Sequence, residues 1–86
     1  MKIEVRLFAS LRSYLPSGSD GAKLFLDMPD GSRVIDVCER LKIPPQLAQL
    51  VMVGGVHEPD RDRPLRDGDT LSIFPPVAGG LLTPDS

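Results

Sequence analysis

Two adjacent prolines near the end of this 86-residue chain separate a part that can fold from a part that cannot extend the fold. A short apolar segment, residues 71–74, runs into Pro75 and Pro76. Each proline fixes φ and lacks a backbone N–H, so a strand over these residues ends there and the chain leaves in an extended direction. We therefore predict one domain over residues 1–76 and a flexible C-terminal tail over residues 77–86.

The composition fits a single small globular domain that depends on packing alone. The chain is 41% hydrophobic and 26% charged, with a net charge of -2 and scattered basic residues, which argues against a nucleic-acid partner. The single cysteine, Cys38, allows neither an intramolecular disulfide nor a thiol-based metal site. Residues 1–6 do not resemble a signal peptide, and no apolar run approaches the roughly 20 residues that span a bilayer. We expect a cytoplasmic protein with no membrane partner.

The first third of the chain predicts two strands. Ile3, Val5 and Leu7 alternate with charged residues, which is typical of a strand with one buried face. Residues 8–15 can form a helical turn, and residues 16–21 a flexible loop. A second strand is expected from about residue 22 to 28, with either Leu24 and Leu26 or the opposite side chain, Phe25, facing the core. The spacing predicts an antiparallel hairpin.

The middle of the chain predicts one amphipathic helix over residues 32–42. Val34, Val37, Cys38 and Leu41 fall at i, i+3, i+4 and i+7, and Ser32 is the expected N-cap. Short elements follow the helix, and we expect them in the order 45–50 (a short helix), 51–53 and 56–58 (strands around a Gly-Gly turn), and 70–74 (the last strand). One helix and four or five strands predict an α+β domain, a mixed sheet with the helix packed on one face.

Few side chains in this chain point to catalysis. Cys38 lies on the apolar stripe of the helix and is expected to be buried and structural, and His57 is expected to lie on the surface. Residues 60–63 predict a solvated charged loop, and residues 67–69 a turn instead of a calcium site. No nucleophile is paired with a base, so we do not expect a free-standing enzyme or a metal site.

The segment after the prolines is different, because it ends in Gly79 and Gly80. Two residues without side chains can enter a passage too narrow for any other residue. Such a segment is suited to reaching into the active site of another protein. Residues 81–86 follow it, so the carbonyl of Gly80 is part of a peptide bond in the encoded chain.

Three segments carry a resemblance to a known family: residues 5–12, residues 64–71 and residues 74–80. Together they resemble the first strand, the approach to the last strand and the C-terminal end of the MoaD/ThiS family of ubiquitin-like sulfur carrier proteins. The resemblance extends over residues 1 to about 80 and is strongest to the small subunits of molybdopterin synthase. It implies a ubiquitin-like β-grasp fold, in agreement with the order of strands and helix above.

The resemblance also implies a function. In the family, an E1-like adenylating enzyme uses ATP to adenylate the terminal glycine, and sulfur then replaces AMP to give a thiocarboxylate. Gly80 would be the reacting residue, Gly79 the slender residue before it, and Pro75 and Pro76 the stiffening residues. The positions implied to lie near the partner-binding surface are Phe8, Arg12, Leu65 and Phe74. We expect an exposed apolar patch there, no bound cofactor, and an acceptor such as the molybdopterin synthase large subunit.

Residues 81–86 depart from the family pattern. We expect a JAMM-type peptidase to remove them, as happens to some carriers of this superfamily. Two alternatives stay open: a β-grasp module that only binds proteins, and a ubiquitin-like modifier joined to lysines after trimming. The sequence also leaves open whether the acceptor is molybdopterin synthase, thiazole synthase or a cysteine-forming enzyme.

Overall fold

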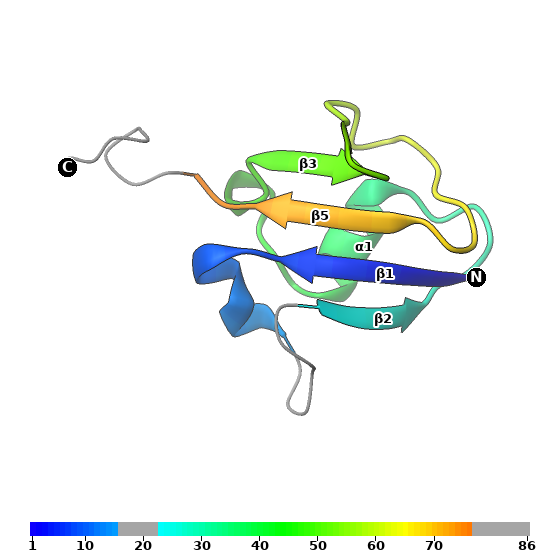
Figure 1. Cartoon of the computed structure of the whole chain (residues 1–86), viewed down its shortest axis with the longest axis horizontal. Coiled ribbons are helices and arrows are strands. Elements are labelled where there is room, and N and C mark those ends of the chain that lie inside the picture. The colour runs from blue at the N-terminus through cyan, green and yellow to red at the C-terminus, as the bar shows by residue number, and fades with distance from the viewer. Residues whose placement is uncertain (16–22, 77–86) are drawn as a thin grey trace, which may run out of the picture.

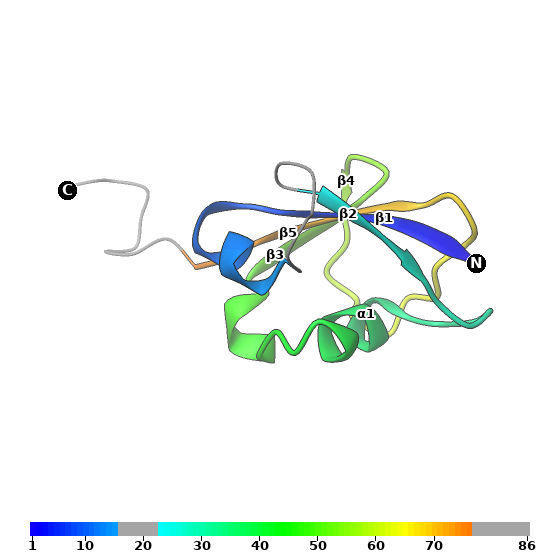
Figure 2. The ribbon, with the colours of Figure 1, turned by 90° about the horizontal axis from the view of Figure 1, so that it is seen from below.

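A computed structural model describes residues 1–15 and 23–76 of the chain. The described elements are β1 (Lys2–Leu7), η1 (Ala9–Tyr14), β2 (Lys23–Asp27), α1 (Val34–Arg40), η2 (Pro45–Leu47), β3 (Leu50–Val53), β4 (Val56–His57) and β5 (Thr70–Phe74), where η1 and η2 are 3₁₀ helices. The strands form one sheet in the order β2-β1-β5-β3-β4, with β1 and β5 parallel and the other neighbours antiparallel (Figure 1). Helix α1 covers one face of this sheet (Figure 2). The predicted α+β class, mixed sheet and β1–β2 hairpin are confirmed.

The hydrophobic core lies between the sheet and α1. Alternating strand residues point toward the helix, and those with 0% exposure are Ile3, Val5, Leu7, Val51, Leu71 and Ile73. From α1, Val34 and Val37 are 0% exposed and Cys38 is 1% exposed, while Leu41 is partly buried. In β2 the core residues are Leu24 and Leu26, so the strand turns Phe25 to the outer face. The helical stripe is therefore confirmed, with Leu41 at its margin.

The predicted N-cap is wrong by one residue. The hydroxyl of Ser32 donates to the carbonyl of Pro29 at 2.7 Å, and residue 33 is still extended, in a β-bridge with Pro64. Arg33 is the N-cap, and its backbone N–H donates to the Asp36 carboxylate at 2.8 Å. This bond satisfies one of the free N–H groups at the helix start and lowers the pKa of the Asp36 carboxyl, which the Arg33 guanidinium lowers further.

The helix also ends earlier than predicted, at Arg40 instead of Lys42. Lys42 adopts a left-handed conformation with φ of 61°, which stops the helix. The N–H of Ile43 then donates to the Cys38 carbonyl at 2.9 Å, and that of Lys42 to the Glu39 carbonyl at 3.0 Å. These two bonds form a Schellman motif, in which the buried Ile43 covers the end of the helix.

The charged loop at residues 60–63 was expected to be only solvated, and this is wrong. The guanidinium of Arg61 donates to the carbonyls of Ala48, Gln49 and Glu58 at 2.6, 3.2 and 3.2 Å. Backbone carbonyls of the same loop accept the N–H groups of the first helical turn. The loop therefore connects the start of α1 to the segment before β3, and its charges alone did not indicate this.

Two predictions fall outside the described residues: the flexible loop at residues 16–21 and the tail at residues 77–86. Among the residues that are described, the helices are all too short or too polar to cross a membrane.

Candidate functional site

The end of β5 is held on both sides at the point where the chain leaves the sheet (Figure 1). The N–H of Gln49 donates to the Phe74 carbonyl at 3.0 Å, and Leu50 lies opposite Phe74 in the β3–β5 ladder. On the other side, the N–H of Phe8 donates to the Ile73 carbonyl at 3.3 Å. The chain beyond Phe74 therefore starts from a fixed position and direction.

An apolar surface surrounds this exit point. The rings of Phe8 and Phe74 are stacked, with centroids 4.2 Å apart and planes 11° apart, and both side chains are partly exposed. Leu50 is 37% exposed and shares the outer face of the sheet with its cross-strand partner Phe74. We call the group formed by Phe8, Leu50, Phe74, Pro75 and Pro76 the tail-root surface. Stacked aromatic rings beside exposed aliphatic side chains are typical of a protein-binding surface.

Arg12 lies in η1, four residues after Phe8, because η1 follows β1 directly. Phe8 is the extended residue before η1, and its carbonyl accepts the N–H of Leu11 at 3.0 Å. Leu11 is 0% exposed and anchors the short helix in the core. One residue later, Arg12 is exposed, and it makes no ion pair within 4 Å to any residue the structure describes. An exposed cation can orient an acidic partner as it approaches.

The structure corrects one predicted member of the patch. Leu65 is only 4% exposed and belongs to the core, where its N–H donates to the Ser32 carbonyl at 2.8 Å. It therefore does not lie on an exposed apolar surface. Leu50 lies there instead, and sequence reasoning missed it. The alternation of residues 50–53 puts Leu50 and Met52 on one face, but the alternation does not reveal that this face borders Phe74.

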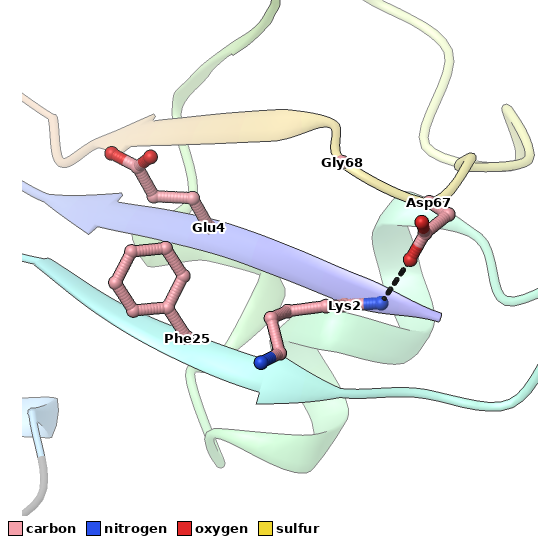
Figure 3. Close-up of a pocket in the computed structure, with 5 residues that line it drawn as sticks. All are labelled: Lys2, Glu4, Phe25, Asp67 and Gly68. Carbon is pink, nitrogen blue, oxygen red and sulfur yellow. Dashed lines mark hydrogen bonds between the residues drawn. The ribbon is translucent and has the colours of Figure 1, made fainter.

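The remaining polar groups offer little for catalysis. Within the described residues, no three His, Cys, Asp or Glu side chains are grouped so as to hold a metal ion. His57 is exposed, and burial raises the pKa of the Cys38 thiol, which keeps it protonated. A shallow hollow of ≈ 230 Å³ lies on the outer face at the other end of β1 from Phe8 (Figure 3). It is lined by Lys2, Glu4, Phe25, Asp67 and Gly68.

A model of the ThiS family matches residues 5–80 of this chain. The chain belongs to the ThiS family. The resemblance to the MoaD/ThiS family is thereby confirmed over most of the sequence. A search of curated proteins found no match.

Solved structures show the same fold. A protein from Pyrococcus furiosus named molybdopterin converting factor, subunit 1, is 27% identical, with a TM-score of 0.65 over 88% of this chain and 98% of that chain. Small archaeal modifier protein 1 of Haloferax volcanii is 24% identical, with a TM-score of 0.67 over 93% and 100% of the two chains. A chain in the complex of subunits 1 and 2 of the Helicobacter pylori molybdopterin-converting factor is 22% identical, with a TM-score of 0.59 over 93% and 100%. The last two show the fold alone, which is the ubiquitin-like β-grasp.

The match to the ThiS family ends at Gly80, so residues 81–86 lie beyond the shared region. The predicted reacting residues, Gly79 and Gly80, lie outside the described part of the structure. The described residues of the chain end at Pro75 and Pro76. Pro75 is partly buried and Pro76 is exposed. They continue from Phe74 on the tail-root surface.

Proposed function

We propose that this ThiS-family chain is a sulfur carrier whose Gly80, once residues 81–86 are removed, is adenylated and converted to a thiocarboxylate. The observation that carries the proposal is where the family match ends. It stops at the second glycine, six residues before Ser86. The stacked Phe8 and Phe74 rings give the root of this segment a surface that a partner can hold.

The proposed chemistry belongs to the partner, and the carrier supplies the acyl group. A Gly80 carboxylate oxygen attacks the α-phosphorus of ATP, and pyrophosphate leaves. A sulfur nucleophile then attacks the activated acyl carbon, and AMP leaves with the electron pair of the broken C–O bond. The carrier needs no catalytic side chain for either step.

The proposal requires that the bond after Gly80 be cleaved first. In the encoded chain the Gly80 carbonyl is an amide, which has no carboxylate oxygen to attack ATP. Leu81 and Leu82 are also too bulky for a channel that admits glycine. We assign the cleavage to a JAMM-type metallopeptidase, in which a zinc-bound water would attack the Gly80 carbonyl.

We propose an E1-like adenylating enzyme as the first partner and a larger acceptor subunit as the second. The Helicobacter pylori structure is a complex of subunits 1 and 2 of a molybdopterin-converting factor, and the Pyrococcus furiosus neighbour carries the name of subunit 1. By analogy with these two neighbours, the acceptor of this chain is the large subunit of molybdopterin synthase. Both partners would dock at the tail-root surface.

Intact-mass spectrometry of two forms of the chain tests the proposal. One form ends at Gly80 and the other at Ser86, and each is incubated with ATP, a sulfur donor and the E1-like enzyme of the same source. We expect only the first form to give an acyl-adenylate and then to gain about 16 Da, because one oxygen is replaced by sulfur.

Each other result contradicts the proposal. Lysine-linked adducts without a thiocarboxylate would identify a protein modifier. No adenylate on the form that ends at Gly80 would leave a module that only binds proteins. A thiocarboxylate on the form that ends at Ser86 would show that residues 81–86 do not block the chemistry.

A further inference from the structure

Strand β2 lies at one edge of the sheet, and its outer side carries backbone groups that β1 does not bind. The N–H groups of Glu4 and Phe8 donate toward β5, to Asp69 and Ile73, so the alternate β1 residues Ile3 and Val5 face β2. Their partners in the ladder are Leu26 and Leu24. It follows that the backbone N–H and C=O groups of the other β2 residues, Lys23, Phe25 and Asp27, point away from the sheet.

Within the described residues, this edge has neither a proline nor a bulge to stop it from pairing with another strand. Proteins generally protect sheet edges with prolines, bulges, very short strands, charged side chains or a covering loop or helix. Strand β2 contains no proline, and its register with β1 is unbroken over all five residues. At its centre, Phe25 is 59% exposed on the outer face (Figure 3). The opposite edge strand, β4, is only two residues long.

The sequence of β2 is complementary to itself when it is read in the antiparallel direction. Lys23-Leu24-Phe25-Leu26-Asp27 has Phe25 at its centre, an identical leucine on each side, and opposite charges at its two ends. An antiparallel copy centred on Phe25 therefore places each Lys23 opposite an Asp27. A two-fold interface requires this relation, in which residue i meets j and j meets i.

We propose that the free edge of β2 binds β2 of a second copy of this chain, so that two sheets join into one continuous ten-stranded sheet. The two Phe25 residues exchange backbone hydrogen bonds across the two-fold axis, and so do the two Lys23–Asp27 pairs, because these are the outward-facing residues. The Phe25 rings lie side by side on the outer face, and the two α1 helices lie on the opposite face.

The Asp27 end of β2 is exposed and available for this pairing, and Lys23 at the other end is partly exposed. The Asp27 side chain is 89% exposed, and its nearest cation is the amino group of Met1 at 3.9 Å. Because that amino group also lies 3.6 Å from Asp30 and donates to the Met28 carbonyl at 2.7 Å, it keeps partners when Asp27 turns to a lysine of the second copy. The dimer leaves the Phe74 ladder untouched, since β1 lies between β2 and β5.

Charge reversal with rescue tests the proposal by sedimentation of the full chain over a range of concentrations. The wild-type chain should associate to a dimer. Lys23→Glu places like charges opposite each other in both symmetric pairs, and so does Asp27→Lys, so each variant should weaken the dimer by about tenfold or more. When the two variants are mixed, every facing pair is again of opposite charge, and a heterodimer should form.

Matched controls carry the same change in charge on exposed residues elsewhere. Arg66→Glu and Glu39→Lys should dimerise like the wild type. The proposal is overturned by a wild-type chain that stays monomeric, by a dimer that survives either β2 variant, or by a mixture of the two variants that fails to associate.

A cysteine at the two-fold axis gives an independent measurement. Phe25→Cys should form a covalent dimer under mild oxidation, because both copies bring residue 25 to the axis. Val56→Cys is the control, since Val56 is 69% exposed on the other edge strand. The native Cys38 is 1% exposed and stays out of the reaction. Equal rates of crosslinking for the two variants would overturn the proposed register.

Discussion

The side chains on the two faces of β5 differ in burial and in the contacts that they make. On the inner face, Leu71 and Ile73 are 0% exposed and pack between the sheet and α1. On the outer face, Ser72 and Phe74 are partly exposed, and the Phe74 ring stacks on Phe8. The inner residues are fixed by the need to fill the core, whereas an outer aromatic residue at the strand end gains little from folding alone. The residues that stabilise the fold therefore lie mainly on the inner face of β5, and the outer face carries the aromatic residue at which we propose that a partner binds.

The largest expected effect is a difference in the free energy of unfolding between substitutions on the two faces of β5. Ile73→Ala should lower the free energy of unfolding by about 2–5 kcal/mol, because it leaves a cavity in a close-packed core. Phe74→Ala should lower it by about 1 kcal/mol, mainly through the lost ring stacking. Urea denaturation of both variants provides the measurement. Equal losses for the two variants would show that the outer face is part of the core, and would break the comparison.

A smaller effect is expected on partner binding when the charge of Arg12 is reversed. Arg12→Glu should weaken binding of the chain that ends at Gly80 to the E1-like enzyme by about threefold to tenfold, because it reverses the charge of an exposed cation four residues after Phe8. Its free energy of unfolding should change by less than about 0.5 kcal/mol. Calorimetric titration measures the affinity, with Arg66→Glu at the other end of β5 as the control. If both variants bind like the wild type, Arg12 lies outside the interface.

The smallest expected effect concerns pH and lies away from both faces, at the start of α1. The Arg33 N–H and guanidinium lower the pKa of Asp36 in the folded state. The ionised Asp36 carboxylate therefore stabilises the fold at pH values above the ordinary Asp pKa of about 4. This stabilisation is lost as the pH falls through the lower pKa that Asp36 has in the folded state. Asp36→Asn should flatten the loss of stability in acid, measured by thermal unfolding between neutral and acidic pH. Glu39→Gln, on the exposed side of α1, serves as control and should retain the wild-type slope.

Local patterns predicted most of the elements correctly. The alternation of Ile3, Val5 and Leu7 identified β1, and the stripe from Val34 to Leu41 identified α1. The pair Gly54-Gly55 predicted a tight turn, and both residues have positive φ, of 60° and 82°, as a two-residue hairpin requires. These predictions succeeded because each depends on interactions between residues close together in the chain.

The predictions that were wrong depend on contacts between residues that are distant in the sequence. Leu65 is an isolated apolar residue in a polar segment, so no periodicity indicates that it is buried. Arg61 looks like a solvated loop residue until the carbonyls of Ala48 and Gln49, distant in sequence, come within hydrogen-bonding distance. Ser32 looked like an N-cap, but the neighbouring bridge between Arg33 and Pro64 keeps the chain extended for one more residue.

The sequence by itself determined where the last strand ends, because Pro75 and Pro76 cannot continue a ladder, and which residues of each strand share a face. Only the tertiary structure decided that β5 pairs with β1 in parallel, which brings Phe8 against Phe74 across 66 residues of chain. The physical reason is that pairing between distant strands depends on the shapes of both strands and on the helix that covers them. No local pattern in either strand contains that information.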